Sequence, residues 1–304
     1  MTTQKLALLF PGQGSQSVGM LSDLSEKFPD AKTFFSKASD VLHYDLWDIV
    51  QNGPAEKLDQ TEFTQPALLA ADVAFYFYWK ASHSQTPAFL AGHSLGEYAA
   101  LVCADAIAFE DAIALVSARG QLMQAAVPEG FGAMAAIVGL DDAVVEEICK
   151  IVSKNLFQRG LVSPANYNSI GQIVIAGTAQ AVEQAIMLAQ EKGAKLAKKI
   201  PVSVPSHCAL MQTAADKMAE KLKSIAIHSP KIPVIQNADV NIYESPDAIR
   251  DALARQLVSP VRWVETIRYI MQHNVHTFVE CGPGKVLAGL NKRISREIVM
   301  EVVN

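Results

Sequence analysis

Short apolar runs alternate with longer segments of helical spacing along most of the chain. The runs at 5–10 (KLALLF), 88–92 (AFLAG) and 277–281 (TFVEC) have the length of buried strands. Alternation of strands with helices is typical of a mainly parallel sheet with helices on both faces, so we expect an α/β fold with a further strand at 232–236. Helical patterns extend to about residue 80, and later helices are expected at 95–104, at 110–126, from a capping Ser206 to about 224, twice within 246–273, and at 285–296.

The middle of the chain has a different pattern. Its expected strands lie at 132–138, 161–167, 172–176 and 194–200, and its expected helices at 141–154 and 178–192. The resulting order, βαββαβ, is the ferredoxin-like pattern. We therefore expect residues 130–202 to form an inserted small ferredoxin-like domain. Residues 1–129 and 203–304 would together form a large catalytic domain of the α/β-hydrolase-like kind.

Composition and charge exclude several classes of protein. Half of the 304 residues are hydrophobic, the net charge is -5, and the basic residues are scattered, so we expect no nucleic-acid surface. No signal peptide and no apolar run long enough for a membrane helix are visible, which favours a cytoplasmic protein with no membrane partner. The cysteines lack C-x-x-C spacing and are expected to be reduced thiols without zinc: Cys103, Cys149, Cys208 and Cys281.

A serine lies at the junction of an expected strand and helix. The segment Gly92-His93-Ser94-Leu95-Gly96 has the nucleophile-elbow pattern, in which small flanking residues permit a sharp turn. The following helix start offers free N–H groups, of which that of Leu95 is the natural donor to an oxyanion. The alternative is a tight turn without chemistry. The context predicts that Ser94 is the nucleophile of an acyl-transfer enzyme.

Seven histidines are candidates for the base that a serine nucleophile needs. His93 is adjacent to Ser94, so its side chain leaves the turn in another direction and is expected to support the site. His207 follows a strand-like stretch at 200–204, where a helix is expected to begin. Open α/β sheets place their sites at the carboxyl ends of strands, which favours His207 as the base. The alternative is a histidine that caps the helix or lies at the edge of the core.

Arg119 occupies the centre of an apolar helix face. A buried arginine needs a partner, and a structural salt bridge or a side chain that reaches solvent are the ordinary explanations. The functional alternative is that Arg119 faces a pocket and binds a substrate carboxylate with its two-pronged guanidinium. Its apolar neighbours on the helical wheel are Ala112, Leu115, Val116, Leu122 and Met123.

Six motifs in order give a resemblance to a known family. They are 10–16 (FPGQGSQ), 92–98 (GHSLGEY), 117–120 (SARG), 204–207 (VPSH), Gln256-Leu257 before 259–261 (SPV), and 280–285 (ECGPGK). With these motifs the chain resembles the malonyl-CoA:acyl carrier protein transacylases of bacterial type II fatty-acid synthesis over nearly its whole length.

The resemblance implies a role for particular residues. Ser94 would be acylated, and His207 would act first as general base and then as general acid. The backbone carbonyl of Gln256 would orient His207 in place of the usual acidic residue. The backbone N–H groups of Gln13 and Leu95 would form the oxyanion hole.

Three further residues complete the site that the resemblance implies. Arg119 would pair with the malonyl carboxylate. Gln65 and Asn166 match positions near the family's pocket, with ordinary loop hydrogen bonds as the alternative explanation. No metal or other cofactor is implied.

The implied reaction is a ping-pong transfer of a malonyl group from malonyl-CoA to the phosphopantetheine thiol of an acyl carrier protein, through a malonyl-serine. A serine thioesterase or esterase on the same elbow is the first alternative, and a carrier-binding scaffold with an inactive elbow is the second. Carrier proteins of this kind are acidic, so basic side chains are candidates for a landing surface: Lys195, Lys198, Lys199, Lys285, Lys292, Arg293 and Arg296.

Overall fold

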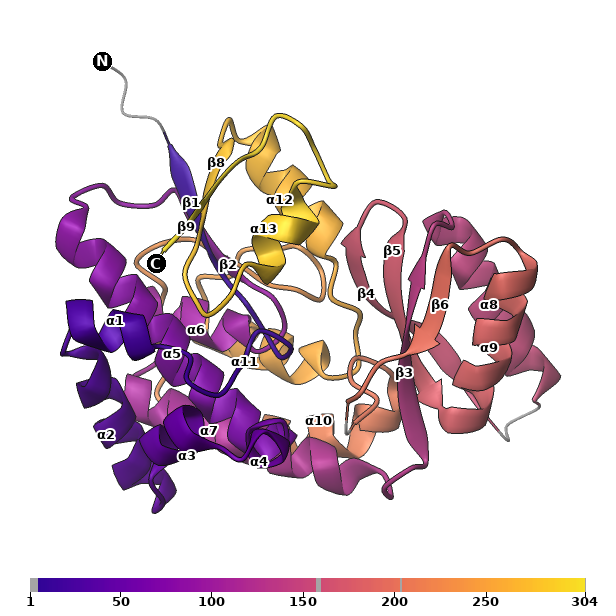
Figure 1. Cartoon of the computed structure of the whole chain (residues 1–304), viewed down its shortest axis with the longest axis horizontal. Helices are drawn as coiled ribbons and strands as arrows, with labels where there is room; N and C mark the ends of the chain where they lie inside the picture. Colours follow the sequence, from indigo (N-terminus) through magenta and orange to yellow (C-terminus); the bar gives the residue numbers. More distant parts are fainter. Residues whose placement is uncertain (1–4, 157–159, 203, 304) are drawn as a thin grey trace.

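The larger part of the molecule is built around a parallel sheet. The computed structural model describes residues 5–156, 160–202 and 204–303. The sheet has the order β7-β2-β1-β8-β9, and all neighbouring strands are parallel (Figure 1). The prediction of a mixed α/β fold with a mainly parallel sheet is confirmed. The strands are β1 (Leu6–Phe10), β2 (Phe89–Gly92), β7 (Val234–Ile235), β8 (Thr277–Glu280) and β9 (Val299–Val302).

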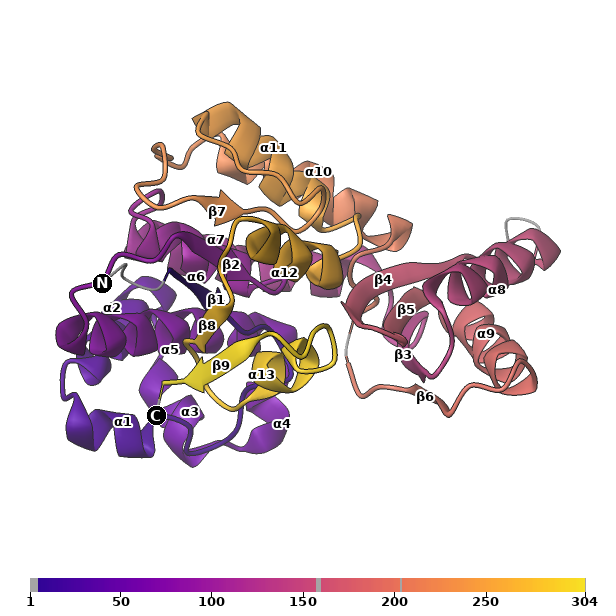
Figure 2. The same ribbon diagram turned by 90° about the horizontal axis from the view of Figure 1, so that it is seen from above.

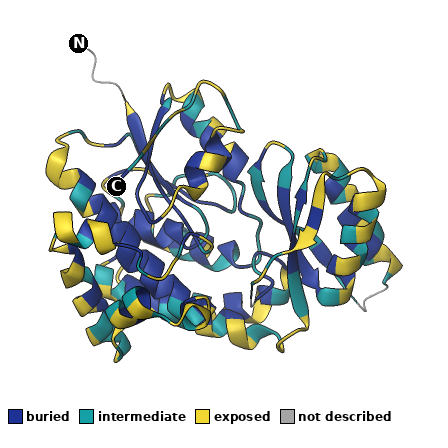
Figure 3. Ribbon diagram, viewed as in Figure 1, coloured by how far each residue is buried: buried dark blue, intermediate teal, exposed yellow. Residues whose placement is uncertain are grey.

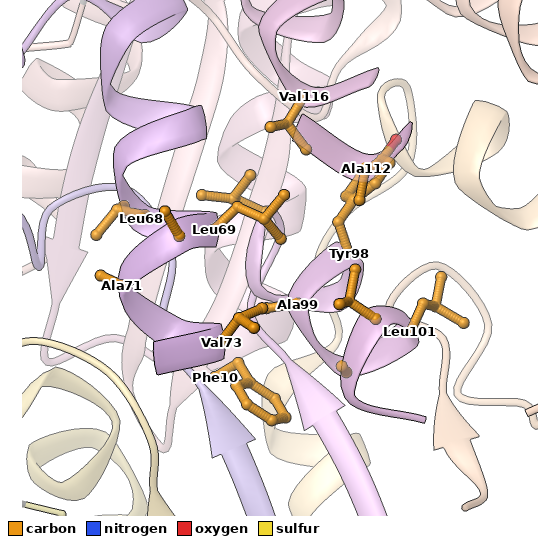
Figure 4. Packing of buried hydrophobic residues seen from close by; sticks show 14 of the residues in the cluster. Phe10, Leu68, Leu69, Ala71, Val73, Tyr98, Ala99, Leu101, Ala112 and Val116 are labelled. Atoms are coloured by element: carbon orange, nitrogen blue, oxygen red, sulfur yellow. The ribbon is translucent and has the colours of Figure 1, made fainter. Parts of the chain in front are cut away.

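Helices cover both faces of this sheet. Successive side chains of β1 point to opposite faces, so each face of the strand packs against its own set of helices. Leu6, Leu8 and Phe10 pack on one side with α5 (Thr61–Ser82), α6 (Gly96–Cys103) and α7 (Phe109–Ala126), as Figure 4 shows for Phe10 among residues of these helices. Ala7 and Leu9 pack on the other side with α12 (Trp263–Gln272) and α13 (Val286–Asn291). In Figure 3 these inner faces are buried, whereas the outer helix faces are exposed.

Further helices surround this core. The N-terminal ones lead into α5, and the later ones pack near α7. They are α1 (Ser22–Lys27), α2 (Ala31–Leu42), α3 (Leu46–Asn52), α4 (Ala55–Leu58), α10 (Gln212–Leu222) and α11 (Pro246–Gln256).

A separate antiparallel sheet lies to one side of the parallel one (Figure 2). Its order is β4-β5-β3-β6, and α8 (Asp142–Asn155) and α9 (Ala179–Glu191) pack on it around a hydrophobic cluster of its own. Each element of this segment was expected from the sequence, and the bounds of β3 are those predicted, while the ends of the others differ by up to two residues. The strands are β3 (Gly132–Val138), β4 (Val162–Ser169), β5 (Gln172–Thr178) and β6 (Leu196–Lys199).

The two parts are joined by backbone hydrogen bonds. The N–H of Tyr167 donates to the carbonyl of Val261, and the N–H of Val261 donates to the carbonyl of Ala165, both over 2.9 Å. Because β4 is anchored in this way to the segment before α12, the antiparallel sheet has a fixed position beside the carboxyl ends of the parallel strands.

Several expected boundaries are wrong. Ser206 does not cap a helix, because His207 has a φ of 61°, which a right-handed helix cannot contain; a short 3₁₀ turn at Ala209–Met211 precedes α10 instead. The strand-like stretch at 200–204 is irregular in its described residues, since β6 ends at Lys199. The helix expected at 285–296 ends at Asn291, and β9 was not predicted because its four residues are ordered by pairing with β8.

Two remaining expectations concern cysteines and membranes. All four cysteines are buried, and none of them forms a disulfide within the described residues. Within the described residues, no helix is both long and apolar enough to cross a membrane.

Candidate active site

Ser94 stands at a sharp turn directly after β2. Its φ is 53°, a left-handed conformation that costs a residue with a side chain roughly 1–3 kcal/mol. The flanking glycines are required by close packing. A Cβ on Gly92 would lie 1.8 Å from the carbonyl carbon of Gly96, and a Cβ on Gly96 would lie 2.1 Å from the backbone oxygen of Phe10. The turn thus holds the Ser94 hydroxyl at the carboxyl edge of the sheet.

His207 reaches Ser94 from a second part of the chain. The Ser94 hydroxyl donates to Nε2 of His207 over 2.7 Å, and Nδ1–H of His207 donates to the backbone carbonyl of Gln256 over 2.8 Å. The second bond fixes the tautomer in which Nε2 can accept a proton. Burial, and then the nearby Arg119 charge, lower the pKa of His207 to about 3. The imidazole of His207 is therefore neutral at physiological pH, and the partner of its Nδ1 is a carbonyl oxygen rather than a carboxylate.

Arg119 is buried beside the nucleophile. Only 1% of its surface is exposed, and its Nη2 donates to the Ser94 hydroxyl oxygen over 3.2 Å and to Oε1 of Gln256 over 2.8 Å. Its Nη1 donates to Oε1 of Gln65 over 2.9 Å. Within residues 5–156, 160–202 and 204–303 it forms no salt bridge, and its Nε has no hydrogen-bond partner. Neutral amides hold the guanidinium, which faces the Tyr98 ring at 5.6 Å, and its nearest carboxyl group in electrostatic terms is the buried Glu97, which forms no ion pair with it.

The residues of the two expected oxyanion donors belong to the same pocket as Ser94. Leu95 and Gln13 both line it, and neither backbone N–H donates to an acceptor in the described part of the chain. Gln13 belongs to the Gly-rich turn after β1, which approaches the elbow so closely that a Cβ on Gly12 would lie 2.4 Å from the backbone oxygen of His93.

The pocket has a volume of about 90 Å³ and lies between the two sheets. Gln65 and Asn166 both line it, the first bound to Arg119 and the second on β4. His93 also lines it, and its Nε2 is hydrogen-bonded to Oδ1 of Asn168 over 2.8 Å. Apolar side chains complete the wall: Leu95, Met123, Met134, Ile200, Val202 and Val204.

Sequence reasoning missed three features of this site. Asn237, Glu97 and the side chain of Gln256 are buried and connect directly to the elbow. The one available signal was that Asn237 follows the strand expected at 232–236, at the same sheet edge as Ser94. Burial raises the pKa of Glu97 to about 7, and one of its oxygens has no partner among the described residues.

No group of histidine, cysteine, aspartate and glutamate side chains suited to a metal ion occurs among the residues that the structure describes.

Comparison with known proteins identifies the family. The family model for the acyl transferase domain matches residues 7–300. The malonyl CoA-acyl carrier protein transacylase of Escherichia coli K12 is 51% identical over 300 residues, covering 99% of this chain and 96% of that protein. Its counterpart in Bacillus subtilis is 45% identical over 294 residues, covering 97% and 92%.

Solved structures agree with the sequence comparisons. The malonyl CoA-acyl carrier protein transacylase of Coxiella burnetii has a TM-score of 0.96 and 54% identity, covering 99% of this chain and 94% of that one. A malonyl-transacylase in complex with its type II PKS acyl-carrier protein has a TM-score of 0.96 and 52% identity, covering 99% and 96%. This chain therefore belongs to the acyl transferase domain family, among the malonyl CoA-acyl carrier protein transacylases.

Proposed function

We propose that this protein transfers a malonyl group from malonyl-CoA to the phosphopantetheine thiol of an acyl carrier protein through a malonyl ester of Ser94. The observation that carries the proposal is the buried Arg119 guanidinium, which forms no ion pair within the described residues and lies 3.2 Å from the Ser94 hydroxyl oxygen. An esterase for neutral acyl groups needs a nucleophile and a base. A buried arginine beside the nucleophile is useful only when the acyl group carries its own negative charge. The names of the relatives support the same substrate and acceptor.

The position of Arg119 favours a short diacid. In a malonyl thioester a single methylene separates the carboxylate from the reacting carbonyl carbon, so whatever binds the carboxylate must lie next to the nucleophile. Arg119 meets this condition through Nη2, and its planar guanidinium is suited to a two-pronged carboxylate contact. A neutral acetyl group would leave the buried charge unpaired, which is unfavourable.

The first half-reaction acylates Ser94. Nε2 of His207 takes the hydroxyl proton while Oγ bonds to the thioester carbonyl carbon, and the resulting oxyanion accepts from the N–H groups of Leu95 and Gln13. When the tetrahedral intermediate collapses, the carbon–sulfur bond breaks. His207 then returns its proton to the leaving coenzyme A sulfur, and malonyl-Ser94 remains.

The second half-reaction is the reverse with another thiol. His207 takes the proton of the carrier's thiol, the sulfur attacks the ester carbon, and Ser94 leaves with the proton from His207. The low pKa of His207 keeps its imidazole neutral at the start of each half, and the transient negative charge of the oxyanion stabilises the imidazolium that forms. Every step uses groups of this chain, so the mechanism requires no cofactor.

We further propose a division of the chain into two domains. Residues 130–202 would form a ferredoxin-like domain, which the strand order β4-β5-β3-β6 and the pairing of α8 with α9 support. Residues 1–129 and 203–304 would form an α/β-hydrolase-like domain, which the parallel sheet and the elbow support. The pocket between the two sheets would then be a site between domains.

We also propose that an acidic carrier protein docks on the basic residues that the sequence analysis named as candidates. Those of the α13 region and of the β6 region are exposed and belong to different domains of the proposed division. Lys199 already pairs with Glu183, and Nη1 of Arg293 donates to Gln172 over 2.7 Å, which leaves five stronger candidates: Lys195, Lys198, Lys285, Lys292 and Arg296.

Intact mass spectrometry after mixing with malonyl-CoA tests the proposed function. We expect a malonyl mass increment on the wild-type protein, none on Ser94→Ala, and loss of the increment when a carrier protein with its phosphopantetheine arm is added. Absence of the increment from the wild type would refute the proposal. Rapid loss of the increment to water, without any thiol, would instead identify a thioesterase.

A further inference from the structure

A side-chain amide holds each of the two peptide groups that flank Ser94. The N–H of Ser94 donates to Oδ1 of Asn237 over 2.6 Å, and the carbonyl of Ser94 accepts from Nε2 of Gln256 over 2.9 Å and, less closely, from the backbone N–H of Glu97 over 3.2 Å. The left-handed backbone of Ser94 is strained, and such strain persists only where surrounding groups hold the residue from more than one side. Asn237 and Gln256 supply this restraint from opposite ends of the residue.

Asn237 is itself rigidly placed. Its Nδ2 donates to the carbonyl of Gly92, and its backbone N–H donates to Oε2 of Glu97, each over 2.7 Å. It is 1% exposed and directly follows the segment in which Ile235 pairs with Ala91 of β2. Since one amide atom faces a carbonyl and the other faces an N–H, only asparagine in this orientation satisfies both partners.

Gln256 connects the elbow to the rest of the site. Its backbone carbonyl accepts from His207, and its side-chain Oε1 accepts from Arg119 Nη2 over 2.8 Å, while its Nε2 holds the Ser94 carbonyl. A single residue thus touches the base, the group that would bind the carboxylate, and the peptide of the nucleophile.

The contact between Gln256 and the Ser94 carbonyl also sets the direction of the Leu95 N–H. In a trans peptide the carbonyl and the N–H point in opposite directions. Gln256 holds the Ser94 carbonyl on one side, so the N–H of Leu95 in the same peptide is directed to the other side. Asn237 occupies the N–H of Ser94, which is therefore not an alternative donor.

We propose that the side chains of Asn237 and Gln256 form an amide clamp that positions the Ser94–Leu95 peptide, so that the Leu95 N–H meets the oxyanion of the acyl-transfer reaction. Both are positioning residues that act through Leu95 and Ser94. The inference rests on the proposed transfer reaction and adds to it Asn237 and the side chain of Gln256, a residue for which the family resemblance implies a role only for the backbone carbonyl.

Rapid-quench measurement of Ser94 acylation by malonyl-CoA tests the clamp. Asn237→Leu removes both amide contacts at similar volume, and Gln256→Met removes the side-chain amide while the backbone carbonyl for His207 stays. We expect acylation on the order of 10²-fold slower in each, the size of effect that a 1 Å misplacement produces. The burst amplitude should stay at one malonyl group per chain, and Asn237→Leu should bind malonyl-CoA as tightly as wild type.

Asn241→Leu is the matched control, because Asn241 is exposed in the same loop, and it should acylate at the wild-type rate.

The burst amplitude of acylation distinguishes a residue that positions Ser94 from one that only stabilises the fold. A purely structural residue would lower the fraction of enzyme that reacts, and the melting temperature, without changing the rate of the fraction that does react. That result, or wild-type rates in both variants, would overturn the clamp. Should Asn237→Leu not fold, Asn237→Asp has the same shape and replaces only the donor to Gly92, and it should still acylate about tenfold more slowly or worse. No adduct in the wild type would refute the proposed function instead.

Discussion

Replacement of Gln65 by glutamate tests how Arg119 selects its substrate. Oε1 of Gln65 accepts from Arg119 Nη1 over 2.9 Å, so Gln65→Glu places a carboxylate of the same shape against the guanidinium. The arginine would then have a permanent anionic partner and a weaker attraction for the carboxylate of a malonyl group. The contact with a neutral acetyl group would not lose a charge–charge attraction.

The expected fall in kcat/KM for malonyl-CoA follows from the energy of the contact between Arg119 and the malonyl carboxylate. Two unit charges about 4 Å apart attract by about 4 kcal/mol at an effective dielectric constant of about 20, and desolvation of the new carboxylate offsets part of this. A hydrogen bond to a charged group contributes a net 1.5–3 kcal/mol or so. At about 1.4 kcal/mol for each factor of ten, kcat/KM for malonyl-CoA should fall roughly 10- to 100-fold.

The assay measures transfer to a carrier protein from malonyl-CoA and from acetyl-CoA, each at subsaturating concentration. Gln65→Leu is the matched control, since it removes the hydrogen bond without adding a charge, and it should reduce malonyl transfer less. An equal loss with both substrates would refute the charge argument, as would unchanged malonyl transfer in Gln65→Glu.

Four further predictions address the same structure. Arg119→Ala should lower malonyl transfer about 100-fold, because charged hydrogen bonds are lost, and should spare or raise acetyl transfer; equal loss on both would contradict the assigned contact. The folded-state pKa of His207, about 3, lies below its unfolded value, about 6.5, so the unfolded chain binds the extra proton first. The free energy of unfolding should therefore fall as pH drops from about 6.5 toward about 3, and denaturant titrations should show a shallower fall in His207→Gln. Gly96→Ala should destabilise by about 1–3 kcal/mol in denaturant because its Cβ would meet the backbone of β1, whereas Gly289→Ala, with open space around it, should not. Lys292→Glu should slow transfer to the carrier while acylation by malonyl-CoA stays at the wild-type rate; equal carrier transfer would remove this residue from the landing surface.

Local patterns in the sequence predicted the elements that depend on local interactions. Buried strands, the elbow at Ser94 and its glycines follow from side-chain spacing and from the space available in a sharp turn. Boundaries that depend on distant contacts were predicted less well. The helix from 285 was expected to be longer, and β9 was missed because its order comes from pairing with β8.

In the site, too, local features were predicted from the sequence and contacts between distant segments were not. The sequence by itself determined a serine in an elbow, an arginine on an apolar helix face and a histidine at the sheet edge, because each is read from its near neighbours along the chain. It left open whether Arg119 formed a salt bridge, and it did not reveal the contacts of Asn237 or of the Gln256 side chain. Tertiary structure decided these points, since the two amides bind the peptide groups of Ser94 across 143 and 162 residues of sequence. Neutral amides around a buried charge arise only when distant segments meet, and no local pattern records which side chains will do so.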